Sequence, residues 1–195
     1  MNAMSDGRLS KIDSDTTNQK SNLSDSLNIH EQFYSYFSAY SSAKNALPSN
    51  GESHSDNLPQ TVNGRFAKNG FYLRIEPDIV SVIDSQLSCK LYVINTSHSK
   101  VNLEAQDSRL NIIAEALDEN NVWQAISYFV SSDCGNSYHK VVLDVDEYWS
   151  FDIPVFKGTF KTKLRYTLNM GKDSSIHSNE VDTRINKGQF NIRKY

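Results

Sequence analysis

A cysteine and a histidine stand close together in the turn-like segment 133–139, DCGNSYH. A thiolate nucleophile beside an imidazole base can carry out hydrolysis, provided that the two side chains come into hydrogen-bond contact. Cys134 and His139 are therefore the candidate catalytic residues. We favour a structural interpretation, because Gly135 and Asn136 are ordinary turn residues and His139 begins an expected strand, where its side chain can point away from the turn.

Two acidic turns offer the oxygen ligands that calcium prefers. The turns are DENN at 118–121 and DVDE at 144–147, and strands running up and down in succession would place both at one end of the fold. The candidate ligands are Asp118, Glu119, Asp144, Asp146 and Glu147. Their spacing does not match the EF-hand loop, which needs a glycine and a final glutamate at fixed offsets. We favour solvated turn carboxylates, and we expect neither a metal nor another cofactor.

Basic residues are concentrated at the carboxyl end of the chain. Residues 157–195 hold nine Lys and Arg against three Asp and Glu, whereas residues 61–156 hold seven against thirteen. The basic candidates for partner binding are Lys161, Lys163 and Arg165. Nucleic acid is not expected, because the pI is about 5.9 and the nearby aromatics Phe160 and Tyr166 fall on the opposite strand face. The basic residues suit either a solvated face that discourages edge pairing or a dock for an acidic partner, including another copy.

The amino-terminal part of the chain changes character near residue 28. Residues 1–27 are rich in Ser, Asp, Asn and Lys and predict a disordered arm. Residues 28–47 carry aromatics at three- and four-residue spacing, which predicts a short amphipathic helix ended by Pro48. The aromatic candidates for partner binding are Phe33, Tyr36, Phe37 and Tyr40. This face either docks on its own domain, which we favour, or is offered to a partner protein.

The rest of the chain predicts strands separated by turns. Residues 48–64 predict a linker, residues 65–190 a β-domain and residues 191–195 a tail. Strands are expected at 71–76, 79–83, 87–95, 101–104, 109–117, 122–130, 138–143, 148–154, 160–168 and within 176–185. The stretch 109–117 also suits a helix, and its β-branched residues decide for a strand. Short connections without helical crossovers indicate antiparallel pairing in two packed sheets.

The chain is organised around residues 148–168, where two strands meet at a corner between Pro154 and Gly158. In each strand apolar residues alternate with polar ones, which is the period of a strand with one buried face. The residues expected at the heart of the core are Trp149, Phe151, Phe160, Leu164 and Tyr166.

Composition limits the location of the protein. The mean hydropathy is -0.55, and no apolar run is long enough to span a bilayer. The start, MNAMSDGR, is not followed by the apolar segment of a secretory signal, so we expect a cytoplasmic protein without membrane contact. Cys89 and Cys134 are then expected to be reduced thiols.

The run LDVDEYWSFDIPVFKGTFKTKLRYTL resembles the late strands of small bacterial immunoglobulin-like or fibronectin-like sandwich modules. The runs DCGNSYHKVVL and SNEVDTRIN with GQF are similar to segments of uncharacterised proteins of that type. The resemblance covers about residues 65–190. It implies the fold and brings no active site, cofactor or ligand.

These observations favour a non-catalytic protein interaction module that binds another protein, or a second copy of itself. One alternative is an immunity or inhibitor protein whose acidic middle section masks a basic enzyme. The other is a small hydrolase that uses Cys134 and His139 or an acidic metal site. Fold alone does not decide among them.

Overall fold

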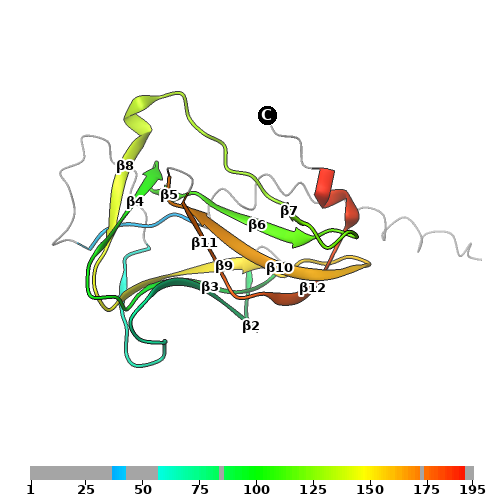
Figure 1. Cartoon of the computed structure of the whole chain (residues 1–195), viewed down its shortest axis with the longest axis horizontal. Coiled ribbons are helices and arrows are strands. Elements are labelled where there is room, and N and C mark those ends of the chain that lie inside the picture. The colour runs from blue at the N-terminus through cyan, green and yellow to red at the C-terminus, as the bar shows by residue number, and fades with distance from the viewer. Residues whose placement is uncertain (1–36, 43–56, 84–85, 172–173, 192–195) are drawn as a thin grey trace, which may run out of the picture.

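The computed structural model describes residues 37–42, 57–83, 86–171 and 174–191. These residues form an all-β fold with two short 3-10 helices (Figure 1). The predicted all-β, antiparallel architecture is therefore confirmed. The elements are β1 (Gln60–Thr61), β2 (Phe71–Ile83), β3 (Gln86–Asn95), β4 (Val101–Gln106), β5 (Arg109–Leu110), β6 (Ile112–Leu117), β7 (Trp123–Ala125), η2 (Gly135–Ser137), β8 (Tyr138–Leu143), β9 (Glu147–Pro154), β10 (Phe160–Asn169), β11 (Ser175–His177), β12 (Val181–Ile185) and η3 (Lys187–Asn191).

The strands pair in three antiparallel sheets. The first sheet has the order β1-β9-β3-β2, and the second has the order β11-β10-β6-β7 with β12 also paired to β10. The third sheet, β5-β4-β8, is smaller. In Figure 1 the first sheet lies below the second, and the third stands at one side of them. The sandwich-like pair of layers predicted from the sequence is present, with a third small sheet that was not foreseen.

The corner between Pro154 and Gly158 carries the chain from the first sheet to the second, because β9 pairs with β3 whereas β10 pairs with β6. Gly158 is required at this corner: a Cβ atom there would overlap the backbone of Ile185 and Asn186. The corner thus links the two layers at a point where the chain passes directly against β12.

The core lies between the layers and follows the predicted alternation. Trp149, Tyr166 and Leu168 are fully buried, and Phe151 and Leu164 are nearly so. Phe160 is only half-buried, since it lies near the end of the layer against Phe190 of η3. Four of the five predicted central residues are therefore in the core, and the fifth borders it.

Residues 37–42 are not helical, and Ser38 forms an isolated β-bridge with Arg109, so the predicted helix over 28–47 is wrong for this part; the rest of it lies outside the described residues. Leu110 donates its N–H to the carbonyl of Phe37 at 3.0 Å, and Ala39 donates to the carbonyl of Ser108 at 2.7 Å. Backbone groups that bond Ser108 and Leu110 in this way are not available for a helical ladder. Tertiary pairing has overridden the local helical pattern.

The end of the predicted 48–64 linker belongs to the first sheet, because β1 pairs with Tyr148 and Glu147 of β9. The chain that follows folds over the outer face of this sheet, where Phe66 packs against Tyr92 and Tyr148 with ring centroids 5.3 and 5.1 Å apart. A second, small apolar cluster therefore covers part of the outer face.

Several strand boundaries differ from expectation. The stretch 109–117 forms two strands, β5 and β6, and the stretch 176–185 extends over two, β11 and β12. Strands predicted separately at 71–76 and 79–83 are one strand, β2, whose register with β3 shifts between Glu76 and Ser81. The strand predicted at 122–130 ends at Ala125, because the hydroxyl of Ser127 then takes the N–H of Ala114 at 2.7 Å. A side chain replaces the backbone carbonyl there, and the ladder stops.

Candidate functional site

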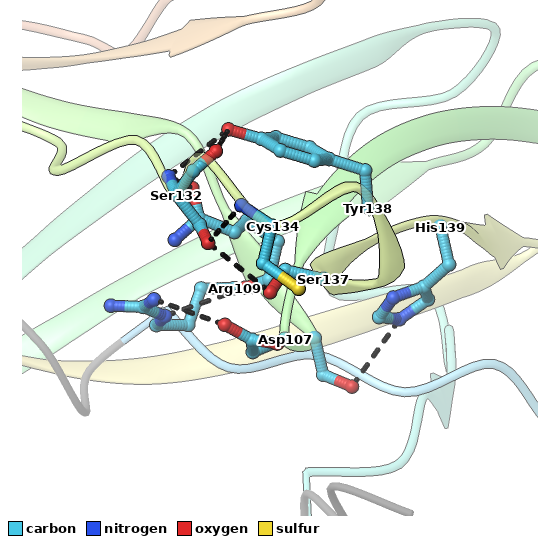
Figure 2. Close-up of polar contacts among 9 residues, drawn as sticks. Asp107, Arg109, Ser132, Cys134, Ser137, Tyr138 and His139 are labelled. Carbon is cyan, nitrogen blue, oxygen red and sulfur yellow. Dashed lines mark hydrogen bonds and ion pairs between the residues drawn. The ribbon is translucent and has the colours of Figure 1, made fainter. Parts of the chain in front are cut away.

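The loop before β8 places Cys134 on the surface (Figure 2). Ser132 anchors this loop: its N–H is donated to the buried side-chain oxygen of Gln106 at 2.8 Å and its hydroxyl accepts the N–H of Cys134 at 3.1 Å. The phenol of Tyr138 also donates to the Ser132 carbonyl at 2.9 Å. These contacts explain the shape of the loop without any ligand.

His139 lies on β8 and faces the β4–β5 hairpin. Its Nε2 is 3.4 Å from the hydroxyl of Ser108, which is buried. Within the described part of the chain, no hydrogen bond joins Cys134 to His139 (Figure 2). The nucleophile and base contact that a cysteine hydrolase needs is therefore not formed by this pair.

The acidic turn at 118–121 uses its own carboxylate. Oδ1 of Asp118 accepts the N–H groups of Val122 and Asn120 at 2.9 and 2.8 Å. The bond from Val122, followed by that from Asn120, holds the pKa of Asp118 below its ordinary value. Glu119 pairs with Lys187 at 2.8 Å. Backbone N–H groups therefore bond the carboxylate of Asp118, and a lysine pairs with that of Glu119.

The two acidic turns do not meet, so the expectation that they lie at one end of the fold, on which the calcium alternative depended, is wrong. The 118–121 turn closes β6 and β7 in the second sheet, whereas 144–147 connects β8 to β9, and Figure 1 shows them at opposite ends of the fold. Glu147 accepts the N–H of Asp144 at 3.0 Å, a bond within the turn. No group of three or more potential metal ligands occurs among the described residues. The assumption that failed was the up-and-down order of the strands.

The four aromatic candidates near the amino end differ in their burial and in whether the structure describes them. Phe37 is buried and makes edge contacts with the rings of Phe151 and Tyr166, at centroid distances of 5.7 and 5.9 Å. It packs on its own domain and offers no surface to a partner. Tyr40 is half-buried, while Phe33 and Tyr36 lie outside the described residues.

The basic face of β10 is largely paired within the protein. Lys163 bonds Glu180 at 3.0 Å, and this bond raises the pKa of Lys163. Arg165 bonds Glu115 at 2.7 Å and lies 4.2 Å above the ring of Trp123. Lys161 is exposed. Partner binding by these residues stays a prediction, and both lysines are exposed whereas Arg165 is half-buried.

The free edge of β2 is a feature that the sequence did not indicate. β2 is the outermost strand of the first sheet and pairs only with β3 among the described strands. An open groove of about 580 Å³ follows it, lined by residues 72–78 and Asn179. A long outer strand with a groove beside it is a template on which another strand can pair.

Asn179, from the loop between β11 and β12, occupies part of this edge. Its Oδ1 accepts the N–H of Ile75 at 2.7 Å and its Nδ2 donates to the carbonyl of Ile75 at 3.1 Å. The side-chain amide therefore bonds Ile75 as a neighbouring backbone would. These bonds also establish that the backbone of Ile75 faces away from β3, and by alternation that of Leu73 faces the same way.

The outer face beside this edge carries charges of both signs. Arg74 is about half exposed, and its Nε lies 3.8 Å from Oε1 of Glu76. Glu76 also pairs with Arg65, whose guanidinium lies 5.0 Å from the centre of the Tyr92 ring. The edge thus combines backbone hydrogen-bonding groups with a short alternation of charge.

No protein-family model, curated protein or solved structure matches the chain. None of the described helices is long and apolar enough to cross a membrane.

Proposed function

We propose that the protein is a non-catalytic protein interaction module with an immunoglobulin-like sandwich, and that it binds a partner by strand addition to β2. The observation that carries this proposal is the bidentate bond between Asn179 and the outward backbone groups of Ile75. It demonstrates that an amide group fits at this edge with good hydrogen-bond geometry. A partner strand supplies such amides at successive positions.

The groove supports the same assignment. It follows β2 over residues 72–78, which is long enough for a short extended segment to lie along the strand. Backbone pairing provides affinity in this mode of binding, and the neighbouring side chains, Tyr72, Arg74 and Glu76 on the outer face, provide selectivity. The free thiols of Cys89 and Cys134 fit the cytoplasmic setting that we propose for the protein.

The test compares partner capture by three forms of the full chain: wild type, Asn179→Ala and Asn63→Ala. Asn179→Ala removes the intramolecular occupant of the edge, so it is expected to retain more partner from an extract of the native host. Asn63 is an exposed asparagine in a different loop, and its replacement is the matched control. Far-ultraviolet circular dichroism verifies that each form is folded.

Amide hydrogen exchange on the captured complex then locates the contact. Protection of Leu73 and Ile75 is the expected result, because their N–H groups face the free side of β2. A partner that protects another strand instead, or equal capture by all three forms, would overturn strand addition at this edge.

A further inference from the structure

The outward side of β2 is complementary to itself. Suppose that two copies pair as antiparallel strands about a two-fold axis at Ile75. A residue that precedes Ile75 in one copy then lies opposite the residue that follows Ile75 by the same number of positions in the other copy. Arg74 of one copy then faces Glu76 of the other, and the pair occurs twice. The two residues project from the same face of β2. Directly opposed residues of opposite charge stabilise an antiparallel pair.

We propose that the β2 edge is an interface for a second copy of this chain, centred on Ile75, and that Asn179 is the intramolecular occupant which the second copy displaces. This rests on the proposed function, since it names the partner for the same edge. The N–H and carbonyl of Ile75 that Asn179 now bonds are the two groups that the paired Ile75 residues exchange.

The backbone limits how far this pairing extends. Leu73 donates its N–H to the carbonyl of Pro77 in the second copy, but Pro77 has no N–H to return. Beyond it, the register of β2 shifts between Glu76 and Ser81, which bends the strand away from a straight ladder. The interface is therefore short, and association through it is reversible.

Asn179 sets the strength of the association. Each dimer gives up two Asn179 contacts, and every such contact is a pair of hydrogen bonds to Ile75. Removing the competitor with Asn179→Ala is expected to tighten dimerisation by about tenfold to a hundredfold. Sedimentation velocity over a concentration series measures this directly, with Asn63→Ala as the control that leaves the dissociation constant unchanged.

Charge exchange tests the register. In the Asn179→Ala background, Arg74→Glu puts two acidic residues opposite each other, and Glu76→Arg puts two basic residues opposite each other. Each variant alone is expected to stay monomeric, because like charges directly opposite are unfavourable. An equimolar mixture of the two is expected to form a heterodimer, since every opposed pair is then complementary.

The outcomes separate this inference from the proposed function. Dimers of Asn179→Ala with exchange protection at Leu73 and Ile75, and rescue in the mixture, support it. A folded Asn179→Ala that stays monomeric overturns it, and so does a dimer whose strength ignores both charge changes. Capture of a different protein at the β2 edge by monomeric Asn179→Ala would sink self-pairing while leaving strand addition intact.

Discussion

The indole N–H of Trp149 donates to the carbonyl oxygen of Tyr40 at 3.0 Å. Trp149 is fully buried in the first sheet, and Tyr40 belongs to the non-helical segment 37–42. One hydrogen bond thus ties a segment with a helical sequence pattern to the centre of the β-core. Phe37, in the same segment, adds its ring contacts with Phe151 and Tyr166. Segment 37–42 is part of the packed structure.

Two replacements of Trp149 should therefore lower the free energy of unfolding by different amounts. Trp149→Phe keeps most of the apolar volume and removes the bond to Tyr40, at a cost of about 1–3 kcal/mol in the free energy of unfolding. Trp149→Ala also leaves a cavity and should cost about 3–5 kcal/mol. Urea denaturation measures both. The half-buried Trp123, replaced by alanine, is the control and should lose less; an equal loss would contradict the central role of Trp149.

Gly158→Ala should destabilise the protein through the corner between the sheets. The added methyl group overlaps the backbone of Ile185 and Asn186, so β10 or β12 must move, at a cost of about 1–3 kcal/mol or more. Thermal denaturation followed by circular dichroism measures the change. Gly135→Ala is the matched control, because no atom lies within 4 Å of a Cβ there. Similar melting temperatures for the two variants would show that the corner accommodates the added methyl group without loss of stability.

The pair Arg165–Glu115 should be more strongly coupled than Lys163–Glu180. The side chains of the first pair are 18% and 16% exposed, against 50% and 46% for the second. Glu115 also accepts the hydroxyl of Thr167 at 2.7 Å. A double-mutant cycle with Arg165→Met and Glu115→Gln should give a coupling energy of about 1–3 kcal/mol. The cycle on the exposed pair should give a clearly smaller coupling energy, because solvent screens the charges of Lys163 and Glu180, and the reverse order would refute the comparison.

Cys89 should make stability depend on pH in the alkaline range. Burial, helped by the charge of Asp152, raises the pKa of Cys89 to about 11 from 9.0. The unfolded chain therefore loses the thiol proton first, so this contribution to stability is complete below pH 9.0 and is lost as the pH rises to about 11. Cys89→Ala should flatten this decline in urea titrations, whereas Cys134→Ala, at an exposed thiol, should not. Identical slopes in all three proteins would exclude the effect.

The sequence predicts the strands and their buried faces well, because alternation reflects contacts along one strand. Ile153 and Leu168 are buried as their spacing indicates. Strand order depends on contacts between distant segments, and no local pattern reports them. For this reason the expectation that the 118–121 and 144–147 turns lie at one end of the fold is wrong: they lie at opposite ends.

The proposed binding edge on β2 could not be predicted from the sequence, because it too depends on contacts between distant segments. Asn179 looks like an ordinary loop residue, and its importance arises only because Ile75 lies beside it in the fold. Pro77 falls in the gap between the strands expected at 71–76 and 79–83, but the structure places it within the single outer strand β2. A residue covers a sheet edge because of its position in the tertiary structure. Local sequence patterns such as alternation or turn composition therefore do not indicate it.

The pairing of β3 with β9 also constrains when the fold can form during synthesis. β3 ends at Asn95, and its partner on one side is complete only when Pro154 has been made. Domains fold largely as units while the chain is produced. A nascent chain that stops before Pro154 carries β2 and β3 as a hairpin without a complete β9, the strand that lies between β3 and β1. In such a chain the second sheet also lacks β10. This protein must therefore wait until most of its length has left the ribosome before either main layer can close.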